Sequence, residues 1–156
     1  RTLLLMLFSA ALFSHAQDST SCDDIPLKAK ADYDAAEDCI VKFCDVALAA
    51  PMIGGGDEAH QARKTIIKWM EGSPDHTFTL SSNIMKVFEG NNLLAFNTYM
   101  CCLAKAAIEN GKGFEKKGLG LFVDYVRNKD NKVEQSSQVK KLLSAWDKGK
   151  VDKYLE

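Results

Sequence analysis

The side chains best suited to acid–base or metal chemistry gather between positions 57 and 78. His60 and His76 are the only histidines after the first sixteen residues, and Asp57, Glu58 and Asp75 lie near them in the sequence. Imidazole and carboxylate groups can transfer protons or bind a metal ion. However, a helix is predicted between the two histidines, and its eleven residues alone rise about 16 Å. We therefore expect each histidine to be a surface or capping residue, and we predict no metal and no cofactor.

The segment that connects positions 71 and 78 is the predicted functional surface. Gly72 and Pro74 end a helix there, and connecting segments often carry binding groups on a rigid scaffold. The alternative is that the aromatic residues on either side pack in the core and the segment only ends the helix. The candidate binding residues are Trp69, Asp75, His76 and Phe78.

The chain has five cysteines. Cys39 and Cys44 lie five positions apart, a helical rise of about 7.5 Å, whereas the Cα atoms of a disulfide lie within about 7 Å. A bond between adjacent Cys101 and Cys102 would need a strained ring. Any bridge should therefore join two helices, with Cys44 to Cys101 as our first choice. Alternatively, these four cysteines are reduced, apolar core residues, and Cys22 is a free thiol or links two chains.

The first sixteen residues predict the destination of the protein. Arg1 precedes an apolar run that ends in Ser14-His15-Ala16, and this order is typical of a secretory signal peptide. We predict a signal peptide over 1–16, a polar leader over 17–27 and an α-helical domain over 28–156. The protein should then be exported, either to the periplasm or outside the cell. A membrane span needs about 20 apolar residues, and we expect none in the mature chain.

Charge is unevenly distributed along the chain. Residues 17–110 carry 14 acidic and 8 basic side chains, whereas residues 111–156 carry 7 acidic and 11 basic ones. The overall balance is close to neutral and does not favour nucleic acid as a partner. The C-terminal excess is either a solvated helical surface or a basic face that binds an acidic partner. That face would contain Lys112, Lys116, Lys117, Arg127, Lys129, Lys132, Lys140 and Lys141.

Apolar residues recur at steps of three and four through most of the mature chain, which is the period of an amphipathic helix. The pattern predicts helices over 28–49, 57–71, 83–89 and 93–109, followed by two shorter helices around 119–126 and 139–146. The segment Leu93–Ile108 is apolar nearly all round and should lie at the centre of the molecule. We therefore predict an all-α fold, a single irregular bundle of five or six helices with a buried apolar central helix.

Residues 69–78 read Trp-Met-Glu-Gly-Ser-Pro-Asp-His-Thr-Phe. They resemble a block, Trp-Met-x-Gly-Ser/Thr-Pro-Asp-aromatic-x-Phe, of an uncharacterised family of small secreted α-helical proteins of Bacteroidetes-like bacteria. The asparagine pair before Leu93 and the lysine-rich C-terminal helices are similar too. The family often has an aromatic residue where this chain has His76. The resemblance implies an export signal and a helical domain, and it assigns no catalytic residue.

Together these patterns favour an exported, non-enzymatic accessory or binding protein whose partner is an unknown protein or small molecule. One alternative is a small exported hydrolase that uses His76, Asp75 and Glu71. Another is a thiol-redox protein, which would need a reactive cysteine of low pKa. The sequence has no Cys-x-x-Cys pair.

Overall fold

The computed structural model describes residues 22, 26–90 and 93–156. Six α-helices make up most of this part of the chain, which contains no β-strand, so the predicted all-α bundle is confirmed. The predicted signal peptide and most of the predicted leader lie outside the described residues. The helices are α1 (Lys30–Ala49), α2 (Gly56–Gly72), α3 (Ser82–Met85), α4 (Leu93–Asn110), α5 (Phe114–Arg127) and α6 (Ser137–Asp147), with 3₁₀ turns η2 (Lys86–Phe88), η3 (Lys129–Asn131) and η4 (Asp152–Tyr154).

Side-chain caps begin several of these helices. The Asp32 carboxylate accepts hydrogen bonds from the backbone N–H groups of Lys28 and Ala29 at the start of α1. Ser81 caps α3 through the N–H of Ile84, and Ser136 caps α6 through the N–H of Val139. Each cap satisfies backbone groups that the first turn of a helix leaves without partners.

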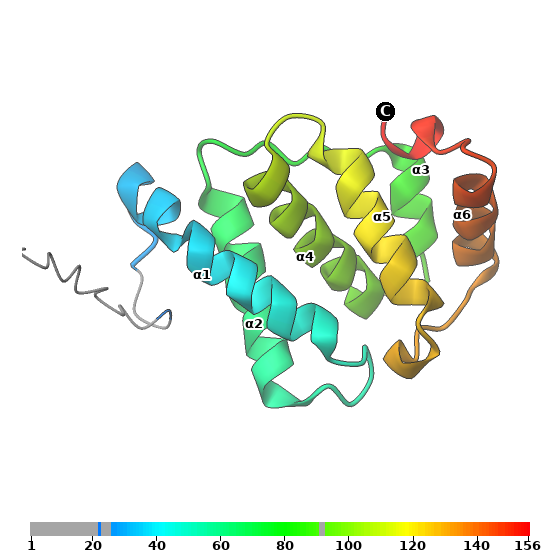
Figure 1. Ribbon diagram of the computed structural model, residues 1–156, viewed down its shortest axis with the longest axis horizontal. Helices are drawn as coiled ribbons and strands as arrows, with labels where there is room; N and C mark the ends of the chain where they lie inside the picture. Colours follow the sequence, from blue (N-terminus) through cyan, green and yellow to red (C-terminus); the bar gives the residue numbers. More distant parts are fainter. Residues whose placement is uncertain (1–21, 23–25, 91–92) are drawn as a thin grey trace, which may run out of the picture.

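Helix α4 lies between α1 and α2 on one side and α5 on the other (Figure 1). Its central residues, including Tyr99, Cys102 and Leu103, are buried. Leu93 and Leu94 differ from the expectation for this segment because they are exposed, and the buried part of α4 begins at Ala95. No helix in the described part of the chain has the length and apolarity that a membrane span requires.

The contact between α4 and α5 depends on a glycine. Gly118 is buried in the middle of α5, and a Cβ atom there would lie 3.1 Å from the Cα of Leu103 and 3.3 Å from the carbonyl oxygen of Cys102. Glycine weakens a helix interior by about 1 kcal/mol relative to alanine. Here it allows the two helices to approach more closely than a larger residue would.

Candidate functional site

The connector after α2 brings three of the four candidate binding residues together. The rings of Trp69, His76 and Phe78 pack against one another, with centroid distances of 5.3 Å for Trp69–His76, 6.2 Å for His76–Phe78 and 6.3 Å for Trp69–Phe78. Trp69 is fully buried, and its Nε1 donates a hydrogen bond to the Tyr33 carbonyl oxygen in α1. The Phe78 ring also meets the edge of Phe114, the first residue of α5. These contacts make the three side chains part of the packing among α1, α2 and α5.

His76 and Asp75 each attach the connector to α1. The Nε2 of His76 lies 3.0 Å from Oε1 of Glu37, and the side chain of His76 is 15% exposed. Asp75 pairs with Lys30, which also pairs with Asp34. These hydrogen bonds raise the pKa of Lys30 to about 12, and the bond from Lys30 holds the pKa of the Asp75 carboxyl below its ordinary value.

The hydrolase alternative groups His76 with Asp75, but the structure gives these two side chains different partners. The carboxylate that reaches His76 is Glu37, whereas Asp75 points to Lys30 instead. Sequence reasoning did not single out Glu37, because only the fold brings α1 against the connector. His60 is exposed on α2 and lines a separate groove with Arg63 and Asn97. No group of three or more metal-ligating side chains occurs among the described residues.

The structure forms a disulfide between Cys22 and Cys39, whose Cα atoms are 5.5 Å apart. Cys44 and Cys101 are instead free and buried, so our first-choice pairing was wrong. That choice placed the bridge between two helices and left Cys22 as a free thiol or as a link between two chains. In the structure, Cys22 lies beside Cys39 in the middle of α1, and it is bonded rather than free.

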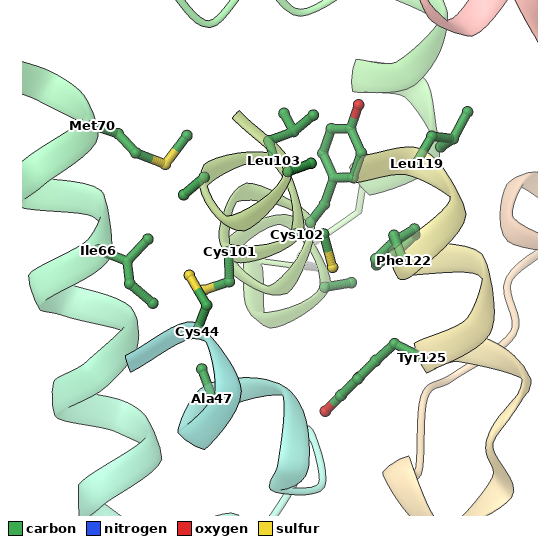
Figure 2. Packing of buried hydrophobic residues seen from close by; sticks show 14 of the residues in the cluster. Cys44, Ala47, Ile66, Met70, Cys101, Cys102, Leu103, Leu119, Phe122 and Tyr125 are labelled. Atoms are coloured by element: carbon green, nitrogen blue, oxygen red, sulfur yellow. The ribbon is translucent and has the colours of Figure 1, made fainter. Parts of the chain in front are cut away.

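The three free thiols lie where helices meet. Figure 2 shows Cys44 and Cys101 beside Ile66 of α2, and Cys102 on the side of α4 that faces Phe122 of α5. All three cysteines are fully buried. Burial raises the pKa of each thiol, to about 12 for Cys101. These three cysteines therefore occupy their positions as small apolar residues. The alternative expectation of four reduced core cysteines agrees with the structure for these three and is wrong for Cys39.

A buried cation holds the end of α1. Arg63 in α2 is 5% exposed and donates from Nη2 to the carbonyl oxygen of Ala47. Tyr125 donates its hydroxyl to the carbonyl oxygen of Ala50, 2.8 Å away. The last turn of α1 has no basic residue of its own, so Arg63 provides the positive charge that favours the C-terminal end of a helix. The Nε of Arg63 has no hydrogen-bond partner in the described part of the chain.

A groove of about 400 Å³ lies between α6 and the C-terminal turn η4. We call it the C-terminal basic groove. Four lysines line it, Lys141, Lys148, Lys150 and Lys153, and none of them takes part in an ion pair found among the described residues. Of the basic face predicted from the sequence, it contains only Lys141; Arg127 is instead paired with Asp147. The groove is lined by Lys141, Ser144, Ala145, Lys148, Lys150 and Lys153.

A further hollow, of about 150 Å³, lies between α1 and α2, beside the disulfide.

Comparison of the chain with protein-family models, curated proteins and solved structures gives no match. The family resemblance carried by residues 69–78 therefore stays a prediction. A function can be argued from the C-terminal basic groove, the hollow beside the disulfide and the connector.

Proposed function

We propose that this protein is an exported, non-enzymatic binding protein that recognises an acidic segment of a protein partner through the C-terminal basic groove. The observation that carries the proposal is the convergence on one concave surface of four lysines that form no ion pair among the described residues. Asp152 and Glu156 are close in sequence but do not line the groove. A hollow with this charge suits an extended acidic segment better than a flat anionic membrane.

The backbone around the groove is held in place at both ends. Gly149, with a φ of +64°, ends α6, and its N–H donates to the Trp146 carbonyl while the Lys150 N–H donates to that of Ala145. This pair of bonds is a Schellman motif. Beyond it, the Lys153 carbonyl accepts from Asn83. The lysines therefore project from an ordered backbone, which lowers the entropic cost of binding.

Tyr154, the residue after Lys153, attaches this backbone to the core. The Tyr154 carbonyl accepts a hydrogen bond from the hydroxyl of Ser81, 3.0 Å away, and the Tyr154 side chain is buried. Turn η4 is thus attached to α3. The groove persists without a partner because both of its walls belong to the folded bundle.

Export is supported by two features. The N-terminal pattern of charge and apolar residues is typical of a signal peptide, and the Cys22–Cys39 disulfide is compatible with an oxidising compartment. Disulfides are rare in the cytosolic proteins of organisms other than hyperthermophiles. The non-enzymatic assignment is supported by Trp69 in α2 and His76 in the connector, which are engaged in packing and in contacts with α1.

A labelled peptide of ten glutamates tests the groove directly. We expect it to bind the mature protein at low salt and to be released near 1 M salt, where the screening length falls to about 3 Å. The variant Lys141→Gln/Lys148→Gln/Lys150→Gln/Lys153→Gln should lose this binding. A matched control changes four other exposed lysines that belong to no ion pair described here: Lys42, Lys86, Lys112 and Lys129.

The control variant should keep the affinity of the unchanged protein. Equal loss of binding in both variants would show that net charge, rather than the groove, attracts the peptide. Binding to phosphatidylglycerol vesicles without binding to the peptide would replace the proposal with a membrane surface. Crosslinking in the native envelope with the same two variants then identifies the partner, which should be captured by the control but not by the groove variant.

A further inference from the structure

The hollow beside the Cys22–Cys39 disulfide has the composition of a small-molecule site. Its walls come from α1, α2 and the segment that precedes α1. Ala36 and Ile40 on its floor are 1% exposed, and Phe43 is half-buried. The disulfide forms part of the wall, and Leu27 completes its apolar lining.

Two polar side chains of α2, Thr65 and Lys68, also line this hollow. Lys68 is exposed and takes part in none of the ion pairs found among the described residues. A hydroxyl and an ammonium group on consecutive turns of one helix can both donate hydrogen bonds to one acceptor. A carboxylate is the acceptor that matches the charge of the lysine.

The volume limits the size of the apolar part. A cavity of about 150 Å³ lined by apolar side chains holds a single benzene-sized group, and the hollow here has about 150 Å³. Small-molecule sites typically combine such walls with a few polar groups that orient the ligand. We propose that the hollow binds a small monocarboxylate, with a single ring or short acyl chain against the apolar wall and the carboxylate at Lys68 and Thr65.

This site is independent of the C-terminal basic groove, because none of its lining residues belongs to α6 or η4. It also differs in the partner that it recognises. The groove presents four lysines and suits an extended acidic segment, whereas the hollow presents one lysine and an apolar wall. The failure of either proposal leaves the other intact.

Benzoate, benzyl alcohol and benzylamine are suitable probes because they share a ring and differ in charge. We expect benzoate to bind the mature, oxidised protein and to shift the backbone amide NMR signals of α1 and α2. Benzyl alcohol should bind about tenfold more weakly and benzylamine more weakly still, since a hydrogen bond to a charged group contributes about that factor. Equal affinity for benzoate and benzylamine would overturn the assignment of Lys68.

Two lysine variants on the same helix form a matched pair. Lys68→Gln should weaken benzoate binding about tenfold, whereas Lys64→Gln should leave it unchanged, because Lys64 is exposed one turn earlier and does not line the hollow. Both positions are on the surface, so neither change should unfold the protein. Equal affinities in the two variants would place benzoate elsewhere.

The disulfide and the floor of the hollow locate the site independently of charge. Cys22→Ser/Cys39→Ser removes part of the wall, and Ala36→Leu fills the space; each should reduce benzoate affinity severalfold, provided that circular dichroism shows the helices intact. If Ala36→Leu unfolds the protein, the smaller change Thr65→Val serves instead and should weaken benzoate more than benzyl alcohol. No benzoate-induced shift in the unchanged protein at millimolar concentrations, or undiminished binding in the folded wall variants, would overturn the site.

Discussion

Thiol chemistry offers the sharpest test of the reasoning from burial to function. Cys44, Cys101 and Cys102 are fully buried between helices. Burial disfavours the charged thiolate, and it raises the pKa of Cys101 from an ordinary value of 9.0 to about 12. Each pKa unit is a factor of ten in the ratio of thiolate to thiol. At pH 8 the thiolate fraction of Cys101 should therefore be about a thousandfold below that of an exposed cysteine.

The sign of the effect is unambiguous. The thiolate is the species that attacks an alkylating reagent or a disulfide. A raised pKa lowers its population throughout the neutral range, and burial excludes the reagent as well. We expect alkylation of the native protein by iodoacetamide at pH 8 to be at least about a thousandfold slower than that of the same protein in urea.

Intact-mass measurements over time provide the assay. In urea without reductant, the protein should gain three carbamidomethyl groups, because Cys22 and Cys39 are bonded and the other three cysteines are free. The native protein should gain none on the same timescale. Rapid single modification of the native protein would refute the burial argument and restore the thiol-redox alternative. A mass two hydrogens lower, with only one reactive thiol in urea, would instead show a second disulfide.

Four substitutions test the packing. Gly118→Ala should destabilise the protein by about 1–2 kcal/mol in urea unfolding, because overpacking against the backbone of α4 outweighs the gain in helix propensity. Gly120→Ala should cost less, because its added methyl would meet the side-chain ring of Trp146 rather than backbone. A larger cost for Gly120→Ala would contradict the inference that Gly118 allows α4 and α5 to approach closely. Arg63→Met leaves the Ala47 carbonyl without the hydrogen bond from Arg63. The free energy of unfolding should fall by about 1–3 kcal/mol, which a lower melting temperature would reveal. His76→Phe keeps the aromatic contacts with Trp69 and Phe78 and loses only the bond to Glu37. The free energy of unfolding in urea should therefore change by less than about 1 kcal/mol. A larger loss would give that bond a greater role.

Much of the helical framework could be predicted because apolar periodicity and end signals are local. In α2, apolar residues at steps of three and four, namely Ala59, Ala62, Ile66 and Trp69, are buried, as is Met70. The helix ends at Gly72, one residue past the predicted end. A helix that must bury one face repeats its apolar residues regardless of what covers that face, so the pattern is visible without the partner helix.

Contacts between distant segments could not be predicted in the same way. The disulfide depends on where Cys22 lies relative to Cys39 of α1, and no local pattern specifies that position. Arg63 lies on the apolar face of α2, yet its charge favours solvent unless the end of α1 is known to lie opposite. Sequence spacing likewise grouped Trp69, His76 and Phe78, but it did not reveal Glu37 on α1 as the group that His76 contacts.

The contacts of α1 explain why we place the proposed binding surfaces away from the connector. The N-terminal half of α1 is attached to the connector by His76–Glu37 and Asp75–Lys30, and to α2 by the indole of Trp69. A ligand at the connector would have to displace these contacts before it could bind. A ligand in the hollow between α1 and α2 or in the C-terminal basic groove would require no such displacement, because the lysines there form no ion pair within the described part of the chain. Recognition at these two surfaces therefore costs the fold less than recognition at the connector, although the connector has the more suggestive sequence.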